Sequence, residues 1–211
     1  MISMAHFVIT IAREKGSGGY DIAKKLADRL NVPFYDRKIL RIASDVSGIN
    51  EQLFGEVDER LGKHEMMRAA EKVYSGEVLP PDSDNYTSQE NLFQFQAKII
   101  RELAETSSCI IVGRCADSIL QGSPYLLRVF IHAPIEARIE RVGTYSLAWS
   151  EAEIKKYISE QDRHRAEYYR FYTGEDWRDA SHYDISLDSA ALGEDGCVSR
   201  IEKALRIFTK G

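Results

Sequence analysis

A glycine-rich stretch between an apolar segment and a helical pattern constrains the fold of this chain more than any other part of its sequence. The segment Phe7–Ile11 is β-branched and aromatic, which is typical of a buried parallel strand. The segment Ile22–Leu30 repeats apolar residues at helical spacing. Between them lie Gly16, Gly18 and Gly19, which let backbone N–H groups converge on an anion at the start of the helix. The stretch therefore predicts a strand, a phosphate-binding turn and a helix.

This stretch differs from the usual phosphate-binding loop G-x-x-x-x-G-K-[ST], in which the lysine reaches the β- and γ-phosphates and the hydroxyl holds magnesium. Aligned with that pattern, Arg13 replaces the first glycine, Gly18 is the second, and Gly19 replaces the lysine. We expect Arg13 or Lys15 to supply the missing positive charge, and the carboxylate of Asp21 to bind Mg²⁺. The residues predicted to surround the phosphate are consecutive: Gly16, Ser17, Gly18, Gly19, Tyr20 and Asp21. The alternative is a tight turn without a ligand, in which Asp21 only favours the helix dipole.

The composition is that of an ordinary globular protein and excludes several classes of function. The 211 residues can bury a sizeable core, and the charged fraction is 29%. A net charge of −5 gives no general attraction to nucleic acid or anionic membranes, so neither is expected as a partner. No apolar run approaches the roughly 20 residues of a membrane span, and the N-terminus does not resemble a secretory signal. Three cysteines without a CxxC pair argue against a disulfide framework or a zinc site and favour a cytoplasmic location.

Strand and helix candidates alternate along the chain. The strand candidates are Phe7–Ile11, Pro33–Tyr35, Cys109–Val112, Leu126–Ile131 and Tyr183–Leu187. Each of the first four precedes a predicted helix, and the last leads into a helix at Asp195–Phe208. This alternation predicts an α/β fold with a five-stranded parallel sheet covered by helices on both faces. Any ligand is then expected at the carboxyl ends of the strands.

We expect residues 1–211 to form a single domain. Two stretches are longer than an alternation of single strands and helices requires, and we expect them to be insertions over the strand ends. The first, about 39–105, contains a predicted surface loop at Val78–Asn85. A capping box at Thr87–Glu90 then opens a helix that ends near Glu105. The second, about 143–176, contains a capping box at Ser150–Glu153 and a long polar helix that ends at Thr173-Gly174.

The strand Cys109–Val112 leads into Gly113-Arg114-Cys115-Ala116-Asp117, and this pattern resembles the cytidylate-kinase-like family, a branch of the P-loop nucleoside monophosphate kinases. The resemblance covers nearly the whole chain and rests on residues 9–19, 33–36, 111–117 and 162–174. It implies a five-stranded parallel sheet with a monophosphate-binding insertion and a lid. It also implies transfer of the γ-phosphoryl group of ATP to CMP or dCMP with Mg²⁺.

The resemblance assigns roles to residues outside the loop. Arg114 would hold the acceptor nucleotide, although Cys115 stands where the family has an aspartate, and Asp117 could serve instead. The acceptor-binding residues expected are Asp36, Arg41, Arg114 and Asp117. In the lid, Arg163 and Arg165 would close over the phosphates, and the expected catalytic residues are Arg13, Lys15, Arg163 and Arg165. The alternatives are a solvated helix face for the lid arginines and a helix cap for Asp36.

Three functions remain open at this point. The first is an ATP-dependent kinase acting on a small nucleotide or phosphorylated metabolite, with CMP or dCMP as the best candidate. The second is a nucleotide- or anion-binding module of the same fold that has lost catalysis, because Gly19 replaces the loop lysine. The third is an interaction protein built on the aromatic residues around Tyr168–Tyr172 and Trp177, which leave a homodimer open.

Overall fold

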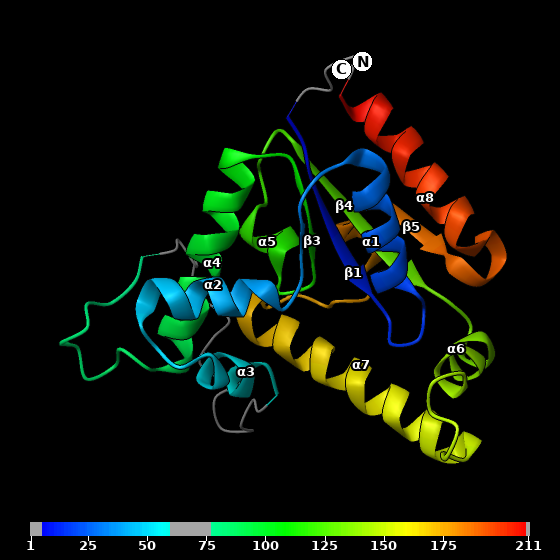
Figure 1. The fold of residues 1–211 in the computed structure, drawn as a ribbon, viewed down its shortest axis with the longest axis horizontal. Helices are drawn as coiled ribbons and strands as arrows, with labels where there is room; N and C mark the ends of the chain where they lie inside the picture. Colours follow the sequence, from blue (N-terminus) through cyan, green and yellow to red (C-terminus); the bar gives the residue numbers. More distant parts are fainter. Residues whose placement is uncertain (1–5, 60–76, 210–211) are drawn as a thin grey trace.

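A five-stranded parallel sheet forms the centre of the structure, a computed structural model that describes residues 6–59 and 77–209 (Figure 1). The strand order is β2-β3-β1-β4-β5. The strands are β1 Val8–Arg13, β2 Phe34–Tyr35, β3 Cys109–Val112, β4 Leu126–His132 and β5 Ile185–Asp188. In the register, Val8 pairs with Cys109 on one side and with Leu126 on the other, so β1 occupies the middle. The predicted α/β class and five-stranded parallel sheet are confirmed.

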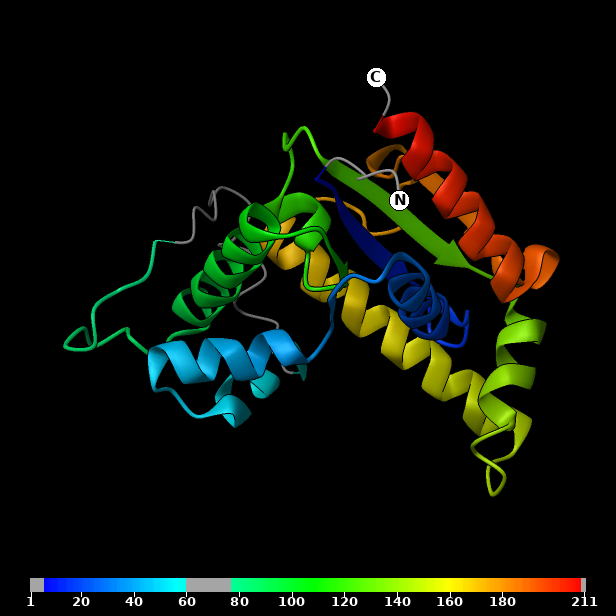
Figure 2. The same cartoon turned by 45° about the horizontal axis from the view of Figure 1, so that its top comes forward.

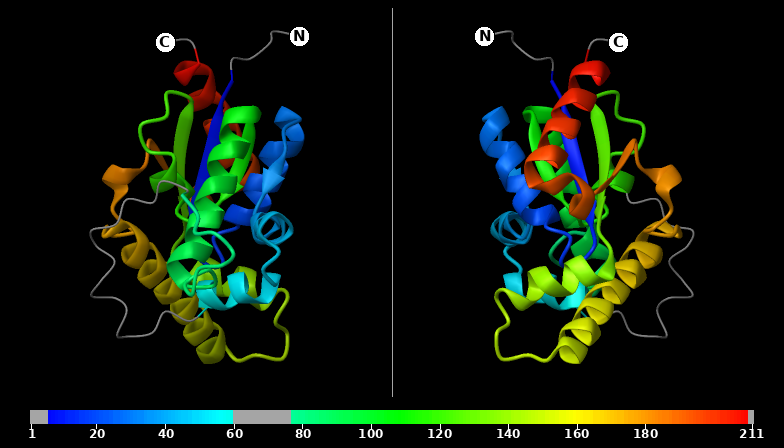
Figure 3. Two further views of the ribbon diagram at one scale, coloured as in Figure 1. Left: turned by 90° about the vertical axis from the view of Figure 1, so that its left-hand side faces the viewer. Right: turned by 90° about the vertical axis from the view of Figure 1, so that its right-hand side faces the viewer.

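Helices fill the connections between the strands. They are α1 Gly19–Leu30, α2 Lys38–Ser47, α3 Glu51–Glu59, α4 Gln89–Thr106, α5 Ala116–Ile119, α6 Ile135–Gly143, α7 Glu151–Thr173 and α8 Ser189–Phe208, with a 3₁₀ turn at Ala180–His182. Figures 1 and 2 show α2, α3 and α4 together on one side of the molecule, with α6 and α8 on the other. In Figure 3, α7 crosses the carboxyl ends of the strands. Within the described residues, no helix is long and apolar enough to span a membrane.

The two faces of the sheet have different cores. Alternate residues of a strand point to opposite faces, so Ile9 and Ile11 pack with aliphatic residues of α1 and α8, such as Ile22 and Ile201. The opposite face, which includes Val8, packs against aromatic residues of α4 and α7. There the rings of Phe93 and Tyr172 stack with centroids 3.8 Å apart. The aromatic end of α7 therefore forms part of the core.

Local sequence signals located most element boundaries, with two corrections. The capping box of Ser150 and Glu153 is present, and α7 ends at Gly174 as expected. The cap of α4 is Ser88 rather than Thr87, because the Ser88 hydroxyl accepts a hydrogen bond from the N–H of Asn91. The last helix begins at Ser189, earlier than predicted, with a non-helical residue at Gly193 that the apolar pattern did not reveal.

Candidate functional site

The loop between β1 and α1 presents backbone donors at the carboxyl edge of the sheet. Gly16 and Gly18 have φ angles of 81° and 75°, a region that favours glycine. Gly18 caps α1, and no side chain caps it. In residues 6–59 and 77–209, no acceptor is found for the N–H groups of Gly18, Gly19, Tyr20 and Asp21. Unpaired donors at a helix N-terminus are suited to an anion.

Arg13 explains why glycine occupies the lysine position of this loop. A Cβ atom on Gly19 would lie only 2.5 Å from the Cβ of Arg13. The Arg13 side chain continues to the end of β3, where a Cβ atom on Gly113 would collide with its guanidinium. The arginine at the first glycine position therefore requires a glycine at the lysine position. A lysine at position 19 would require Arg13 to move.

A buried ionic network fixes the first half of the loop. Arg138 on α6 donates to Asp162 on α7, and its Nη1 lies 3.1 Å from Oε2 of Glu14. Nη1 of Arg165 lies 3.2 Å from Oδ1 of Asp162. Oδ1 of Asp162 also accepts a hydrogen bond of 2.7 Å from the N–H of Lys15. These contacts connect the loop to both α6 and α7.

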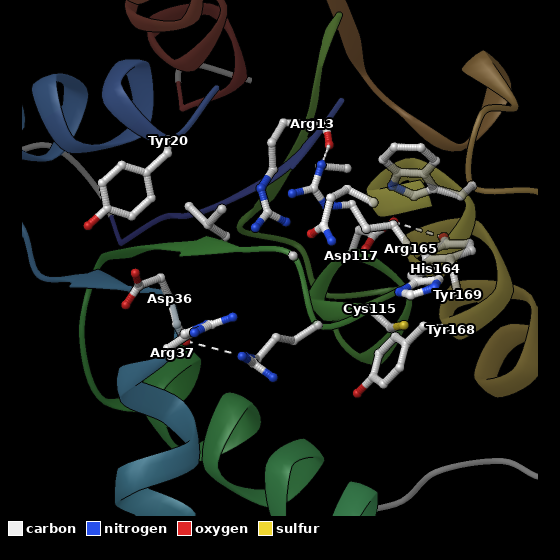
Figure 4. A pocket seen from close by; sticks show the side chains of 16 residues that line it. Arg13, Tyr20, Asp36, Arg37, Cys115, Asp117, His164, Arg165, Tyr168 and Tyr169 are labelled. Carbon is white, nitrogen blue, oxygen red and sulfur yellow. Dashed lines mark hydrogen bonds between the residues drawn. The ribbon is translucent and has the colours of Figure 1, made fainter. Parts of the chain in front are cut away.

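Arg165 has a second role in the same region. Its Nη1 donates to the backbone oxygen of Arg13 at 3.2 Å, and Figure 4 shows the two side chains next to each other. Burial lowers the pKa of Arg165, whereas the Asp162 carboxylate raises it. The side chains of Arg13 and Arg165 thus meet at the end of β1, where a bound anion would face both of them.

The ammonium of Lys15 contacts two aromatic rings. It lies 5.1 Å from the ring centroid of Tyr157 and 5.8 Å from that of Tyr145, which are cation–π contacts with the segment around the start of α7. The charge that Lys15 offers therefore lies beside these two rings.

Two cavities adjoin at the end of β1. The loop cavity, about 870 Å³, is lined by Lys15–Asp21 except Ser17, by α6 and by the start of α8. The strand-end cavity, about 620 Å³, lies beyond the ends of β2 and β3 and includes Asp36, Arg37, Arg114 and Asp117 (Figure 4). Both cavities are lined by Arg13, Tyr20 and Arg165. Ligands in the two cavities would face each other across these three side chains.

The floor of the strand-end cavity contains a buried carboxylate. Asp117 accepts a hydrogen bond of 2.8 Å from the Tyr169 hydroxyl. Burial raises the pKa of Asp117, and the bond from Tyr169 opposes that rise. Burial also raises the pKa of Tyr169, so this hydroxyl stays protonated and donates.

Arg114 lines the same cavity and lies in a strained backbone. Arg114 and Cys115 have φ angles of 61° and 54°, and non-glycine residues with such angles concentrate at functional sites. The Nε of Arg114 donates to the backbone oxygen of Asp36, and its Nη1 donates to Gln96, each at 3.3 Å. The first bond connects the ends of β2 and β3, and the second connects the end of β3 to α4.

Three of the expected residues lie outside both cavities. Ser17 is buried, and its hydroxyl donates to the backbone oxygen of Glu14 at 2.9 Å. The side chain of Arg163 is 63% exposed and lies 4.0 Å from Glu167. Arg41 is exposed on α2, one turn beyond Arg37, which does line the strand-end cavity. The remaining candidates all line at least one cavity.

Sequence reasoning missed several lining residues whose spacing was informative. Gln161, His164 and Tyr168 line the strand-end cavity together with the predicted Arg165, and the spacing of the four places them on one face of α7. Arg163 falls outside this face. Arg138 and Arg141 on α6 were also missed, although α6 follows the carboxyl end of β4, which pairs with β1.

Comparison with known proteins places this architecture in a family. A family model described as "Cytidylate kinase-like family" matches residues 8–191. A cytidylate kinase of Methanopyrus kandleri is 28% identical over 207 residues, covering 94% of this chain and 92% of that protein. The crystal structure of an uncharacterized protein from Eubacterium ventriosum has a TM-score of 0.69 at 25% identity and covers 95% of this chain and 98% of that one.

A shikimate kinase from Bacteroides thetaiotaomicron shares the fold. Its TM-score is 0.53 at 16% identity, and the match covers 96% of this chain and 99% of that chain. Because the family model extends from the first strand to the start of α8, this protein belongs to the cytidylate kinase-like family.

Proposed function

We propose that this protein is a nucleotide kinase that transfers the γ-phosphoryl group of ATP to a nucleoside monophosphate, with CMP or dCMP as the acceptor. The observation that carries the proposal is the meeting of two cavities at Arg13, Tyr20 and Arg165. Phosphoryl transfer needs two ligands in line and cations around the group that moves. Membership in the cytidylate kinase-like family supports the same reaction.

The loop cavity suits the donor. The N–H groups of Gly18–Asp21 would bind its phosphates, and the γ-phosphate would lie toward Arg13 and Arg165. Guanidinium groups bind phosphate oxygens through two parallel N–H bonds, which fixes the geometry as well as the charge. Arg13 and Arg165 would thereby stabilise charge on the transferred group.

Magnesium fits this proposal at Asp21, whose exposed carboxylate lines the loop cavity. Within the described residues, no group of three or more His, Cys, Asp or Glu side chains is arranged to hold a metal ion. Mg²⁺ often uses one or two protein carboxylates together with substrate phosphates, which agrees with a single aspartate here. When bound, the ion would neutralise charge on the donor phosphates.

The strand-end cavity suits the acceptor. Arg37 and Arg114 would bind its phosphate, while Asp36 and Asp117 offer acceptors for ribose or base hydrogens. The described parts of residues 39–105 would then form the acceptor side of the domain, and residues 143–176 would form a lid that carries Arg165. Residues 60–76 of that insertion lie outside the described residues. A module that only binds one anion would not need this second cavity beside the loop, so we favour the kinase.

The test is a phosphoryl-transfer assay with Mg-ATP and a panel of CMP, dCMP, UMP, AMP, GMP and shikimate. We expect ADP formation with CMP or dCMP and little with the others. The Arg13→Ala and Arg165→Ala variants should each lose about a hundredfold or more in kcat, because each removes a contact to the transferred group.

The matched control is Arg206→Ala. Arg206 is an exposed arginine on α8 that lines neither cavity. The variant should retain wild-type activity. Binding of ATP without turnover of any acceptor would overturn the kinase proposal and would favour the binding module.

A further inference from the structure

Arg141 on α6 places its guanidinium against the start of α1. Its Nη1 donates to the backbone oxygen of Gly16 at 3.4 Å. A Cβ atom on Gly18 would lie only 2.8 Å from the Cζ of Arg141, so the guanidinium occupies the space that a side chain at position 18 would need. The Arg141 side chain lines the loop cavity and is 32% exposed. A cation from a different helix is therefore packed onto the phosphate-binding loop.

This position is unfavourable for a cation unless an anion binds there. The N-terminus of a helix carries partial positive charge on its unpaired N–H groups, which here are those of Gly18–Asp21. The carboxylate of Glu194 lies 3.8 Å from Nη2 of Arg141, and both groups are partly exposed, so their pairing is weak. By contrast, Arg138, one turn earlier on the same helix, is buried between Glu14 and Asp162. Arg138 is compensated by the carboxylates of Glu14 and Asp162, whereas Arg141 pairs only loosely with Glu194, which is partly exposed.

The two other cations near the loop, Arg13 and Lys15, lie against other parts of the site. The Arg13 side chain runs past Gly19 to Gly113 at the end of β3, toward the strand-end cavity. The Lys15 ammonium lies over the rings of Tyr145 and Tyr157. Neither therefore covers the face of the loop at Gly18, where Arg141 lies.

We propose that Arg141 performs the role of the missing loop lysine and binds the β- and γ-phosphates of the donor, an inference that rests on the proposed kinase function. The charge is supplied by α6 instead of α1, so the phosphate site is built from two helices. Glycine at position 18 is required for this arrangement because any side chain there would displace the guanidinium.

The experiment measures binding by titration calorimetry with no acceptor present, using ATP and inorganic tripolyphosphate as probes. The variants are Arg141→Ala, Arg141→Gln and Arg141→Lys, with Arg206→Ala as the exposed control. Arg141→Gln keeps a side-chain donor for the oxygen of Gly16 but removes the charge. Melting temperatures report whether each variant is folded.

We expect Arg141→Ala and Arg141→Gln to weaken both probes by about tenfold to a hundredfold, the usual effect of one charged hydrogen bond. Arg141→Lys should recover part of this loss, because it restores the charge without the planar fork. The control should bind like the wild type. A purely bracing role predicts that Arg141→Gln binds tripolyphosphate as the wild type does, and this result would overturn the inference.

The two proposals fail in different ways. If no acceptor is phosphorylated but Arg141→Gln still loses tripolyphosphate binding, the kinase proposal is wrong and the role of Arg141 in holding phosphate stands. If transfer occurs and the Arg141 variants bind ATP normally, only the inference about Arg141 is wrong.

Discussion

Two buried aspartates at opposite ends of the site are stabilised by different means. Asp162, 2% exposed, lies among the guanidiniums of Arg138, Arg165 and Arg178 and accepts the N–H of Lys15. Asp117, 6% exposed, accepts a hydrogen bond from a neutral tyrosine hydroxyl, and burial raises its pKa. The protein compensates the first carboxylate with cations and leaves the second with much less compensation.

This difference suits the two carboxylates to different roles, Asp162 to structural support and Asp117 to ligand recognition. A buried charge surrounded by opposite charges holds the surrounding elements in one geometry, and here these are the loop, α6 and α7. A buried carboxyl group without close cations is costly, and such groups concentrate at functional sites. We therefore propose that Asp162 maintains the shape of the loop and that Asp117 contacts the acceptor.

The largest effect should come from removing the compensated carboxylate. Asp162→Ala leaves Arg165 without its carboxylate partner and Arg138 with Glu14 alone, and it should lower the free energy of unfolding by about 3–5 kcal/mol. Urea unfolding monitored by circular dichroism measures the change. ATP binding should fall as well, because the Lys15 backbone loses its anchor.

Asp195→Ala is the matched control for that variant. Asp195 also contacts two cations, Lys25 and Arg29, but on the surface. Solvent screens such pairs, so the stability of this variant should stay near that of the wild type. Equal losses for the two variants would show that the buried network adds nothing to stability beyond a surface pair.

A smaller, pH-dependent effect should follow when Asp117 is made neutral. Because the pKa of Asp117 is raised in the folded state, its protonated form stabilises the fold at low pH. That stability is lost as the pH rises from the unfolded pKa, about 3.9, through the folded pKa. Asp117→Asn has no such titration, so its stability relative to the wild type should increase with pH in this window, by at most about 1.4 kcal/mol per pH unit.

Unfolding curves at several pH values between 4 and 7 test this expectation. Parallel curves for Asp117→Asn and the wild type would show that Asp117 has an ordinary pKa, and the contrast with Asp162 would disappear. The same variant should raise the KM for CMP more than that for ATP, because Asp117 lines the strand-end cavity and not the loop cavity.

The fold and the glycine-rich loop could be predicted from the sequence because their signals lie within short segments of the chain. The buried strand Cys109–Val112 was predicted with its observed bounds, and the Ser150–Glu153 capping box was found from four residues. The link between Arg13 and Gly19 was not visible, because it depends on how the end of β1 faces the start of α1. Arg141 was missed for a similar reason, since its contact with Gly16 spans 125 residues. Helical periodicity in α7 could have separated Arg165 from Arg163.

The smallest effect tests the hydrogen bond that supports Asp117. Tyr169→Phe removes the donor and should lower the free energy of unfolding by about 1 kcal/mol at neutral pH. Since that bond lowers the pKa of Asp117, its loss should matter less at low pH, where the carboxyl group is protonated. Tyr183→Phe removes a buried hydroxyl that donates to the backbone oxygen of Trp177 at 2.8 Å, a group that does not titrate. The free energy of unfolding lost in Tyr183→Phe should therefore be the same at every pH. If the two variants show the same pH dependence, Asp117 is not the ionising partner of Tyr169, and the assignment of this carboxylate to acceptor recognition loses its physical basis.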